Sequence, residues 1–401
     1  MRDPAAFLTA EYDELVAKGL DWKTHLLNGP STPWCTVDGR KVLMLCSNNY
    51  LGFSNHPRLR EAAIKAIQTH GAGSGSVRTI AGTMDLHAEL ETRLARFKEA
   101  EASLVYQTGY AANSGLIPQL VGAEDLIVSD ELNHGSIIDG VRLSHAERGV
   151  YRHRDMEDLR RVLEDAERHA PAYRRILIIT DGVFSMDGDI APLDAIARLG
   201  HEHGAMVYVD DAHGEGVLGE KGRGIVSHFK LGRGDVHVEM GTFSKAFGVV
   251  GGHISGSRAL INFAHDKSRT FLLTGSSPPP VIAACIAAID LLETEPEHVK
   301  RLWQNTNYFR KAMLDLGFDT GRSQTPIIPV MVGESTMARR LSDRLIEEGV
   351  FALPIVFPMV ARDKARIRTN LNAALTQEDL DFAIGVFQKI GREIGLLKAT
   401  S

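Results

Sequence analysis

Apolar residues along this chain follow two spacings, one typical of strands and one typical of helices. Helical patterns at 58–70 and 89–99 show apolar residues every three or four positions. Short runs rich in valine, isoleucine and leucine follow at 103–107, 125–130, 175–182, 206–214 and 235–241. Nearly continuous apolar strands that alternate with helices are typical of a parallel or mixed sheet covered on both faces. The pattern therefore predicts an α/β fold with a mostly parallel central sheet.

The layout of the chain changes after the SSPPP segment at 276–280. An apolar helical stretch follows, and the strand patterns at 327–333 and 365–372 are then accompanied by amphipathic helical patterns. We predict three units, which are an N-terminal arm over 1–50, a large domain over 51–285 and a smaller α+β domain over 286–401.

Composition narrows the class of protein. The 401 residues carry a formal net charge of −6 and 44% hydrophobic residues, without a basic tract for nucleic acid or an apolar run of 18 residues for a membrane. The charged N-terminus lacks the pattern of a signal peptide, so we expect a cytoplasmic protein. Cys35, Cys46 and Cys285 are widely spaced, and the 16 histidines show no metal-ligand spacing. We therefore expect reduced cysteines and no metal site.

The segment MGTFSKAFG, at 240–248, places Lys245 among small and apolar residues just after a predicted strand. Two explanations compete for this lysine. It lies on a solvated loop, as most lysines do, or it is a nucleophilic amine in a partly dry site that forms an imine with an aldehyde.

Asp210 favours the second explanation. It stands at the end of a predicted strand in MVYVDDAHG, 35 residues before Lys245. Pyridoxal phosphate needs a carboxylate beside its ring nitrogen and a lysine that carries it, and residues after neighbouring strands can supply both. The alternative for Asp210 is a turn or capping residue.

Three further features suit the same ligand. Gly109 in YQTGYAANSGL opens a probable helix whose N–H groups would bind a phosphate. His134, in DELNHGSIIDG, could stack on the pyridine ring or be a structural histidine. The hydroxyls of Thr242 and Ser244 could bind the phosphate or cap a turn. The glycine-rich stretch at 71–83 is no dinucleotide fingerprint, because a helix precedes it.

The chain resembles the α-oxoamine synthases, a family of pyridoxal-phosphate enzymes. The resemblance runs almost end to end and implies fold type I, the aspartate aminotransferase-like fold. It rests on SNNYLG (47–52), GSGSVRTIAGT (73–83), DELNHGSIIDG (130–140), TDGVFSMDGDIAPL (180–193), VDDAHGEGVLGEKGRG (209–224), GTFSKAFG (241–248) and ARIRTN (365–370).

The resemblance implies catalytic roles for four residues. Lys245 would hold the cofactor and move the Cα proton, Asp210 would pair with the pyridine nitrogen, His213 would lie near the phenolic oxygen, and His134 would stack on the ring. Ser185 would sit beside the cofactor's oxygen and the substrate.

The resemblance also implies residues that bind the cofactor's phosphate. Gly109, Tyr110 and Thr242 would hold it, and Thr274 and Ser276 would reach in from a second subunit, which makes the protein a homodimer with shared active sites.

The substrate's carboxylate would be bound by Asn48 and Arg368, since a guanidinium matches a carboxylate bidentately. Arg366, two residues earlier, is the competing choice. The chain has Leu375 where the family often has a histidine, and its PIVFPMV segment (354–360) differs from the usual pocket edge.

The activity implied is a Claisen-type condensation between a small amino acid and an acyl-CoA. Glycine with acetyl-CoA or another short acyl-CoA is our first expectation. The alternatives are the 8-amino-7-oxononanoate synthase reaction of alanine with pimeloyl-CoA, a serine palmitoyltransferase-like reaction, and a pyridoxal-phosphate aminotransferase or decarboxylase. A catalytically silent subunit is disfavoured by Lys245, Asp210 and His134.

Overall fold

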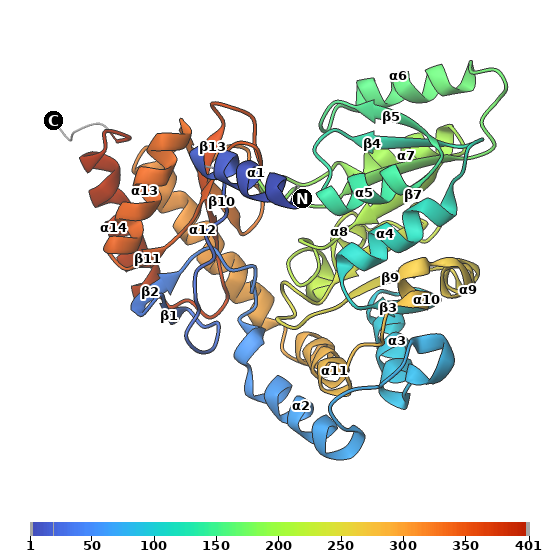
Figure 1. Cartoon of the computed structure of the whole chain (residues 1–401), viewed down its shortest axis with the longest axis horizontal. Helices are drawn as coiled ribbons and strands as arrows, with labels where there is room; N and C mark the ends of the chain where they lie inside the picture. The colour runs from blue at the N-terminus through green and yellow to red at the C-terminus, as the bar shows by residue number, and fades with distance from the viewer. Residues whose placement is uncertain (1–2, 19, 398–401) are drawn as a thin grey trace.

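The computed structural model describes residues 3–18 and 20–397 and has two lobes (Figure 1). The larger lobe is built on a seven-stranded sheet with the order β3-β9-β8-β7-β6-β4-β5. Neighbouring strands are parallel except for β9, which is antiparallel to β3 and β8. This sheet confirms the predicted α/β class. Its strands are β3 (Ala102–Tyr106), β4 (Leu126–Asp130), β5 (Glu147–Tyr151), β6 (Ile176–Asp181), β7 (Met206–Asp210), β8 (Val238–Thr242) and β9 (Gly252–Gly256).

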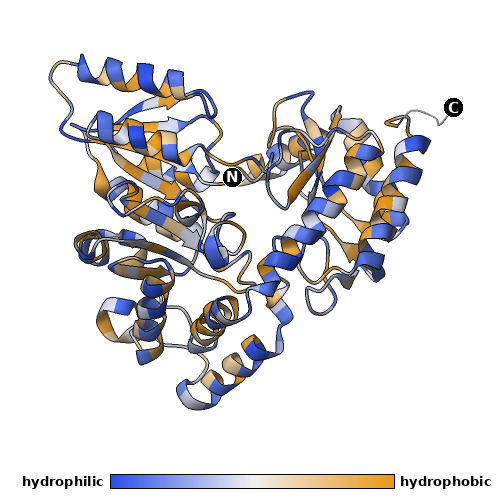
Figure 2. Ribbon diagram, turned by 180° about the vertical axis from the view of Figure 1, so that it is seen from behind, coloured by the Kyte–Doolittle hydropathy of each residue, from blue (hydrophilic) through white to orange (hydrophobic). Residues whose placement is uncertain are grey.

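Helices cover both faces of this sheet, and alternate strand residues pack on alternate faces. In β7, Tyr208 joins one apolar cluster, while Val207 and Val209 join the other. The strands are orange with bluer helices outside them in Figure 2. The face of Tyr208 is covered by α4 (Gly109–Leu120), α5 (Gly135–Leu143), α9 (Arg258–Lys267) and α10 (Arg269–Leu273). The other cluster draws on α3 (Asp85–Phe97), α6 (Met156–Glu167), α7 (Leu193–Glu202), the short α8 (Ile225–His228) and α11 (Pro279–Thr294).

The smaller lobe contains the C-terminal part of the chain. Its sheet has the order β10-β13-β12, and all pairings are antiparallel. Thr376 and Asp379 form a reciprocal capping box that begins the last helix. The elements are α12 (Glu297–Asp315), β10 (Ile327–Gly333), α13 (Ser335–Glu347), β11 (Val350–Phe351), β12 (Pro354–Ile355), β13 (Ala365–Asn370) and α14 (Gln377–Glu393).

The N-terminal part of the chain, up to residue 70, contacts both lobes. Helix α1 (Ala6–Ala17) buries none of its residues. Strands β1 (Trp34–Val37) and β2 (Arg40–Met44) form a small sheet with β11, while α2 (Pro57–His70) packs on α11. The division into three units stays a prediction, and its boundary at residue 285 falls inside α11.

Strands β4, β6, β7 and β8 are parallel, so their carboxyl ends meet at one edge of the large sheet. These strands end at Asp130, Asp181, Asp210 and Thr242. Polar side chains from distant parts of the chain are thereby brought together where ligands bind open α/β sheets. In the described ranges, none of the helices has the length and apolar character needed to cross a bilayer.

Candidate active site

An open cavity of about 210 Å³ lies at this edge of the sheet. Side chains of β6, β7 and β8 reach it together with the starts of α4 and α5. Eight of the predicted site residues line it, which are Gly109, Tyr110, His134, Ser185, Asp210, His213, Thr242 and Lys245.

Asp210 is held in place by two hydrogen bonds at the end of β7. Its Oδ1 accepts the backbone N–H of Ala212 at 3.1 Å, and its Oδ2 accepts the side-chain amide of Asn113 at 2.7 Å. Asn113 is fully buried and is itself fixed, because its Oδ1 accepts the Tyr208 hydroxyl at 2.7 Å and its Nδ2 also donates to Ser136 at 2.9 Å. The carboxylate is therefore preorganised to meet a cationic group in the cavity.

Lys245 follows β8 and lines the same cavity, although 35 residues separate it from Asp210. Burial lowers the pKa of its amine, while the carboxyl groups of Asp210 and Asp181 oppose this shift. An amine with a lowered pKa is a better nucleophile and base near neutral pH. The solvated-loop explanation is therefore disfavoured.

Two histidines line the cavity from different elements. His134 is the N-cap of α5, and its backbone N–H donates to Asp181 at 2.7 Å. His213 lies in the turn after β7, with its Nδ1 2.8 Å from the Tyr50 hydroxyl. Burial lowers the pKa of both imidazoles, and the charge of Lys245 lowers it further. The lowered pKa favours the neutral form of both rings, and a neutral imidazole can accept a proton.

The N-terminus of α4 is suited to binding an anion. Thr108 is its N-cap, and the Thr108 hydroxyl accepts the N–H of Ala111 at 3.0 Å. Gly109 leaves room beside Thr242, because a Cβ at this position would lie 3.4 Å from the Cβ of Thr242. Backbone N–H groups at a helix N-terminus favour a phosphate electrostatically.

Arg368 of β13, in the smaller lobe, adjoins the cavity through Ser185, although neither Arg368 nor Asn48 lines it. The Arg368 guanidinium donates to the Ser185 carbonyl at 3.1 Å, and its charge lowers the pKa of His213 and Lys245. Asn48 Oδ1 accepts the Asn370 side chain at 2.9 Å. Arg366 is instead paired with Asp187, which favours Arg368 as the free carboxylate ligand.

Three other positions lie away from this cavity. Thr274 is exposed, whereas the Ser276 hydroxyl donates within its own chain to the Gly82 carbonyl at 2.7 Å. A role for either residue in a second subunit stays a prediction. Leu375 is 4% exposed and belongs to the apolar core, outside the residues that line the cavity.

Sequence reasoning missed several polar residues of the site. Asn113 lies in YQTGYAANSGL, but it contacts Asp210 only because of its position on α4. Asp181, at the end of β6, was detectable as a strand-end aspartate, and Tyr50 lies in SNNYLG, but only the structure shows that Tyr50 contacts His213. Thr108, before Gly109, carried the N-cap preference for threonine and was detectable.

These residues fit pyridoxal phosphate by their chemistry. The cavity combines an amine of lowered pKa, a carboxylate held by two donors, a helix N-terminus cleared by Gly109, and neutral imidazoles. An aldehyde, a ring nitrogen, a phosphate and an aromatic ring are the groups that such a set would bind.

Comparison with known proteins identifies the family. The family model of aminotransferase class I and II matches residues 40–387. The chain is 56% identical to 8-amino-7-oxononanoate synthase of Symbiobacterium thermophilum, over 98% of this chain and 99% of that protein. The solved Sphingomonas wittichii serine palmitoyltransferase has a TM-score of 0.92 at 32% identity, over 99% of this chain and 100% of its own.

A further solved structure, described as SPT with PLP, has a TM-score of 0.92 at 30% identity, over 99% of this chain and 100% of its own. The expected resemblance, fold type and cofactor are thereby confirmed. The chain belongs to the aminotransferase class I and II family and, within it, to the α-oxoamine synthases, which are pyridoxal-phosphate-dependent acyltransferases.

Proposed function

We propose that this enzyme catalyses the 8-amino-7-oxononanoate synthase reaction. In it, the Cα of alanine bonds to the acyl carbonyl of pimeloyl-CoA, the thioester C–S bond breaks, and CoA and carbon dioxide leave. The observation that supports this choice is the 56% identity to a protein of that name over nearly the full length of both chains. It replaces glycine and acetyl-CoA, our first expectation, as the preferred pair.

Bound pyridoxal phosphate would supply an electron sink for the charge that develops at the amino acid's Cα. Asp210 would keep the ring nitrogen protonated, since Asn113 and Ala212 hold its carboxylate in a fixed position. The amine of Lys245, whose pKa burial lowers, would accept the Cα proton and later return one. His134 would hold the ring face and thereby orient the reacting bond.

The phosphate would be held at the start of α4. The backbone N–H groups of Gly109 and Tyr110 and the hydroxyl of Thr242 would donate to it, since all three residues line the cavity. Thr242 now donates to the Gly251 carbonyl at 2.7 Å, so its hydroxyl would rotate to reach an anion. Together these donors would fix the cofactor against the sheet.

The amino acid's carboxylate would be bound by Arg368 and Asn48. Arg368 comes from the smaller lobe and reaches Ser185 of the larger lobe, so substrate binding would hold the two lobes together. This arrangement keeps the carboxylate in one position relative to Lys245 until carbon dioxide is released.

We also propose that a second copy of the chain completes each site, as the resemblance implies. Thr274 is exposed, and its neighbours Leu273 and Ile80 expose 68% and 83% of their surface. A backbone bridge between Val77 and Gly275 joins the two segments. Large exposed apolar side chains on adjacent segments are typical of an interface. Sedimentation of the protein and of a Leu273→Asp variant tests this, and an active monomer would refute it.

Release of free thiol tests the substrate assignment. The enzyme is incubated with acetyl-, propionyl- and pimeloyl-CoA, each with glycine, alanine and serine. We expect kcat/KM to be highest for pimeloyl-CoA with alanine, by roughly tenfold or more over the other pairs. A preference for acetyl-CoA with glycine would contradict the proposal and restore the first expectation.

A further inference from the structure

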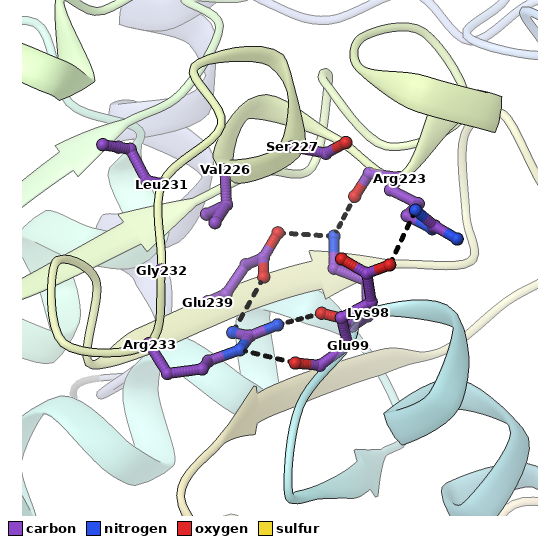
Figure 3. A pocket seen from close by; sticks show the side chains of 9 residues that line it. All are labelled: Lys98, Glu99, Arg223, Val226, Ser227, Leu231, Gly232, Arg233 and Glu239. Atoms are coloured by element: carbon purple, nitrogen blue, oxygen red, sulfur yellow. Dashed lines mark hydrogen bonds and ion pairs between the residues drawn. The ribbon is translucent and has the colours of Figure 1, made fainter.

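A cluster of charged side chains lies inside the larger lobe, close to the cavity but outside it. We call it the charge cluster, and it comprises Lys98, Asp211, Glu215, Arg233, Glu239 and His253. Apart from Arg233, these side chains are at most 1% exposed. Figure 3 shows Lys98, Glu239 and Arg233 bonded to one another, with Arg233 also reaching the backbone carbonyl of Lys98. The proposed reaction uses none of these six residues.

The charge cluster and the cavity are on opposite faces of the same strands. Along β8, Met240 and Thr242 line the cavity. Successive residues of a strand face opposite sides, so Glu239 and Gly241 face away from the cavity. His253 of β9 pairs with Gly241 and shares that face. The charge cluster therefore lies directly behind the strands that carry the cavity.

Lys98 is at the centre of the charge cluster. Its ammonium lies 2.8 Å from Glu215 Oε1, 2.5 Å from Glu239 Oε1 and 3.7 Å from Asp211 Oδ2. Glu215 Oε2 is also 2.9 Å from His253 Nε2. Buried charges persist only when they are paired in this way. Burial raises the pKa of Glu215, but the charges of His253 and Lys98 outweigh the effect of burial and lower the pKa to about 2. The carboxylate therefore stays ionised.

Three glycines make room for these carboxylates. A Cβ at Gly214 would lie 2.0 Å from Asp211 Oδ1, and one at Gly224 would lie 1.8 Å from Asp211 Oδ2. A Cβ at Gly241 would lie 2.1 Å from Glu215 Oε2. The backbone at these three glycines therefore lies close to the two carboxylates and leaves no room for a Cβ.

Asp211 and Glu215 are the two ends of one tight turn. The N–H groups of Gly214 and Glu215 both donate to the Asp211 carbonyl at 3.0 Å. His213 lies within this turn and points into the cavity, and Asp210 immediately precedes it. The charge cluster thus holds both ends of the segment that presents His213 and follows Asp210.

We propose that Glu215 is a positioning residue. Through its bonds to Lys98 and His253 it would fix the 211–215 turn, and so set where Asp210 and His213 meet the pyridoxal ring. The inference rests on the proposed roles of Asp210 and His213. A shifted turn would change the electronic state of the cofactor and the rate of proton removal, and would leave the binding of the amino acid's carboxylate, on the other lobe, unchanged.

The test is a Glu215→Gln variant of the holoenzyme, with Glu239→Gln as its matched control. Glu239→Gln removes the same charge from Lys98 but lies outside the turn. Three quantities are measured, which are the visible absorbance of the bound cofactor, its retention after dilution, and the rate of exchange of alanine's Cα proton in D₂O at varied alanine concentration. The exchange needs no acyl-CoA and so does not depend on the acyl specificity.

For Glu215→Gln we expect an altered absorbance band and exchange about tenfold slower, with KM for alanine within about twofold. For Glu239→Gln we expect wild-type values. Equal effects of both variants, or a folded Glu215→Gln enzyme with a normal band and rate, would overturn the inference. If Glu215→Gln does not fold, His253→Gln removes one of its two anchors and is held to the same criteria.

An Asp210→Asn variant separates this inference from the proposed function. If Asp210→Asn exchanges normally, the site assignment itself fails. If Asp210→Asn is inactive while Glu215→Gln is normal, only the positioning role of Glu215 is refuted.

Discussion

The proposed binding position for the cofactor's phosphate depends on a glycine that is not among the residues lining the cavity. Gly252, in β9, lies against the backbone that precedes α4. A Cβ at this position would lie 2.3 Å from the carbonyl carbon and oxygen of Thr108, and 2.4 Å from the backbone nitrogen of Gly109. The groups in the way are backbone atoms, which cannot rotate aside. A Gly252→Ala substitution therefore forces the Thr108–Gly109 peptide to move.

The size of the movement follows from these distances. The peptide must move by about 1 Å to restore an ordinary contact of 3.4 Å. A shift of that size would disrupt at least one of the proposed N–H bonds to the phosphate. A hydrogen bond to a charged group contributes about 1.5–3 kcal/mol. We therefore expect the cofactor to bind about 10- to 100-fold more weakly.

Equilibrium dialysis of the variant against pyridoxal phosphate measures this loss. Gly385→Ala is the matched control, because nothing lies within 4 Å of the Cβ that it adds in the interior of α14. It should leave cofactor binding unchanged and stabilise the helix by up to about 1 kcal/mol. If folded Gly252→Ala binds the cofactor within about threefold of wild type, the phosphate is not held at the start of α4.

Three further predictions concern the site and its surroundings. Lys245→Ala should abolish turnover and the absorbance of the covalently held cofactor. Normal turnover would refute the proposed role of Lys245. Arg368→Met should raise KM for the amino acid by about 10- to 100-fold through loss of a charge-assisted bond, with the acyl-CoA KM as an internal control. Burial lowers the pKa of His153, but Asp130 and Asp189 outweigh it and raise the pKa to about 9. Because the pKa of His153 is higher in the folded than in the unfolded protein, protonated His153 stabilises the fold. This stabilisation is complete below about pH 6.5 and is lost as pH rises to about 9. Urea unfolding should show that the free energy of unfolding falls by at most about 3 kcal/mol between about pH 6.5 and 9. In a His153→Gln variant this fall should be smaller.

The periodic strands and helices of the large sheet followed from the sequence. The strand that ends at Asp210 and the helix that begins at Gly109 were predicted because strand alternation and turn residues are local signals. Strand β5, Glu147–Tyr151, was missed, because at the edge of the sheet it buries only its last residue and lacks an apolar run. Strand β9 was missed because Gly252 and Gly256 obscure its apolar pattern.

The sequence by itself predicted which residues bear the chemistry, since Lys245, Asp210 and His134 each lie at or just after the end of a strand. Only the tertiary structure decided what supports them. Asn113 meets Asp210 across 97 positions, Arg368 reaches Ser185 from another lobe, and the charge cluster forms behind the cavity. The physical reason is that spacing and turn residues act over a few positions, whereas contacts across a sheet depend on strand order and on which face each side chain occupies.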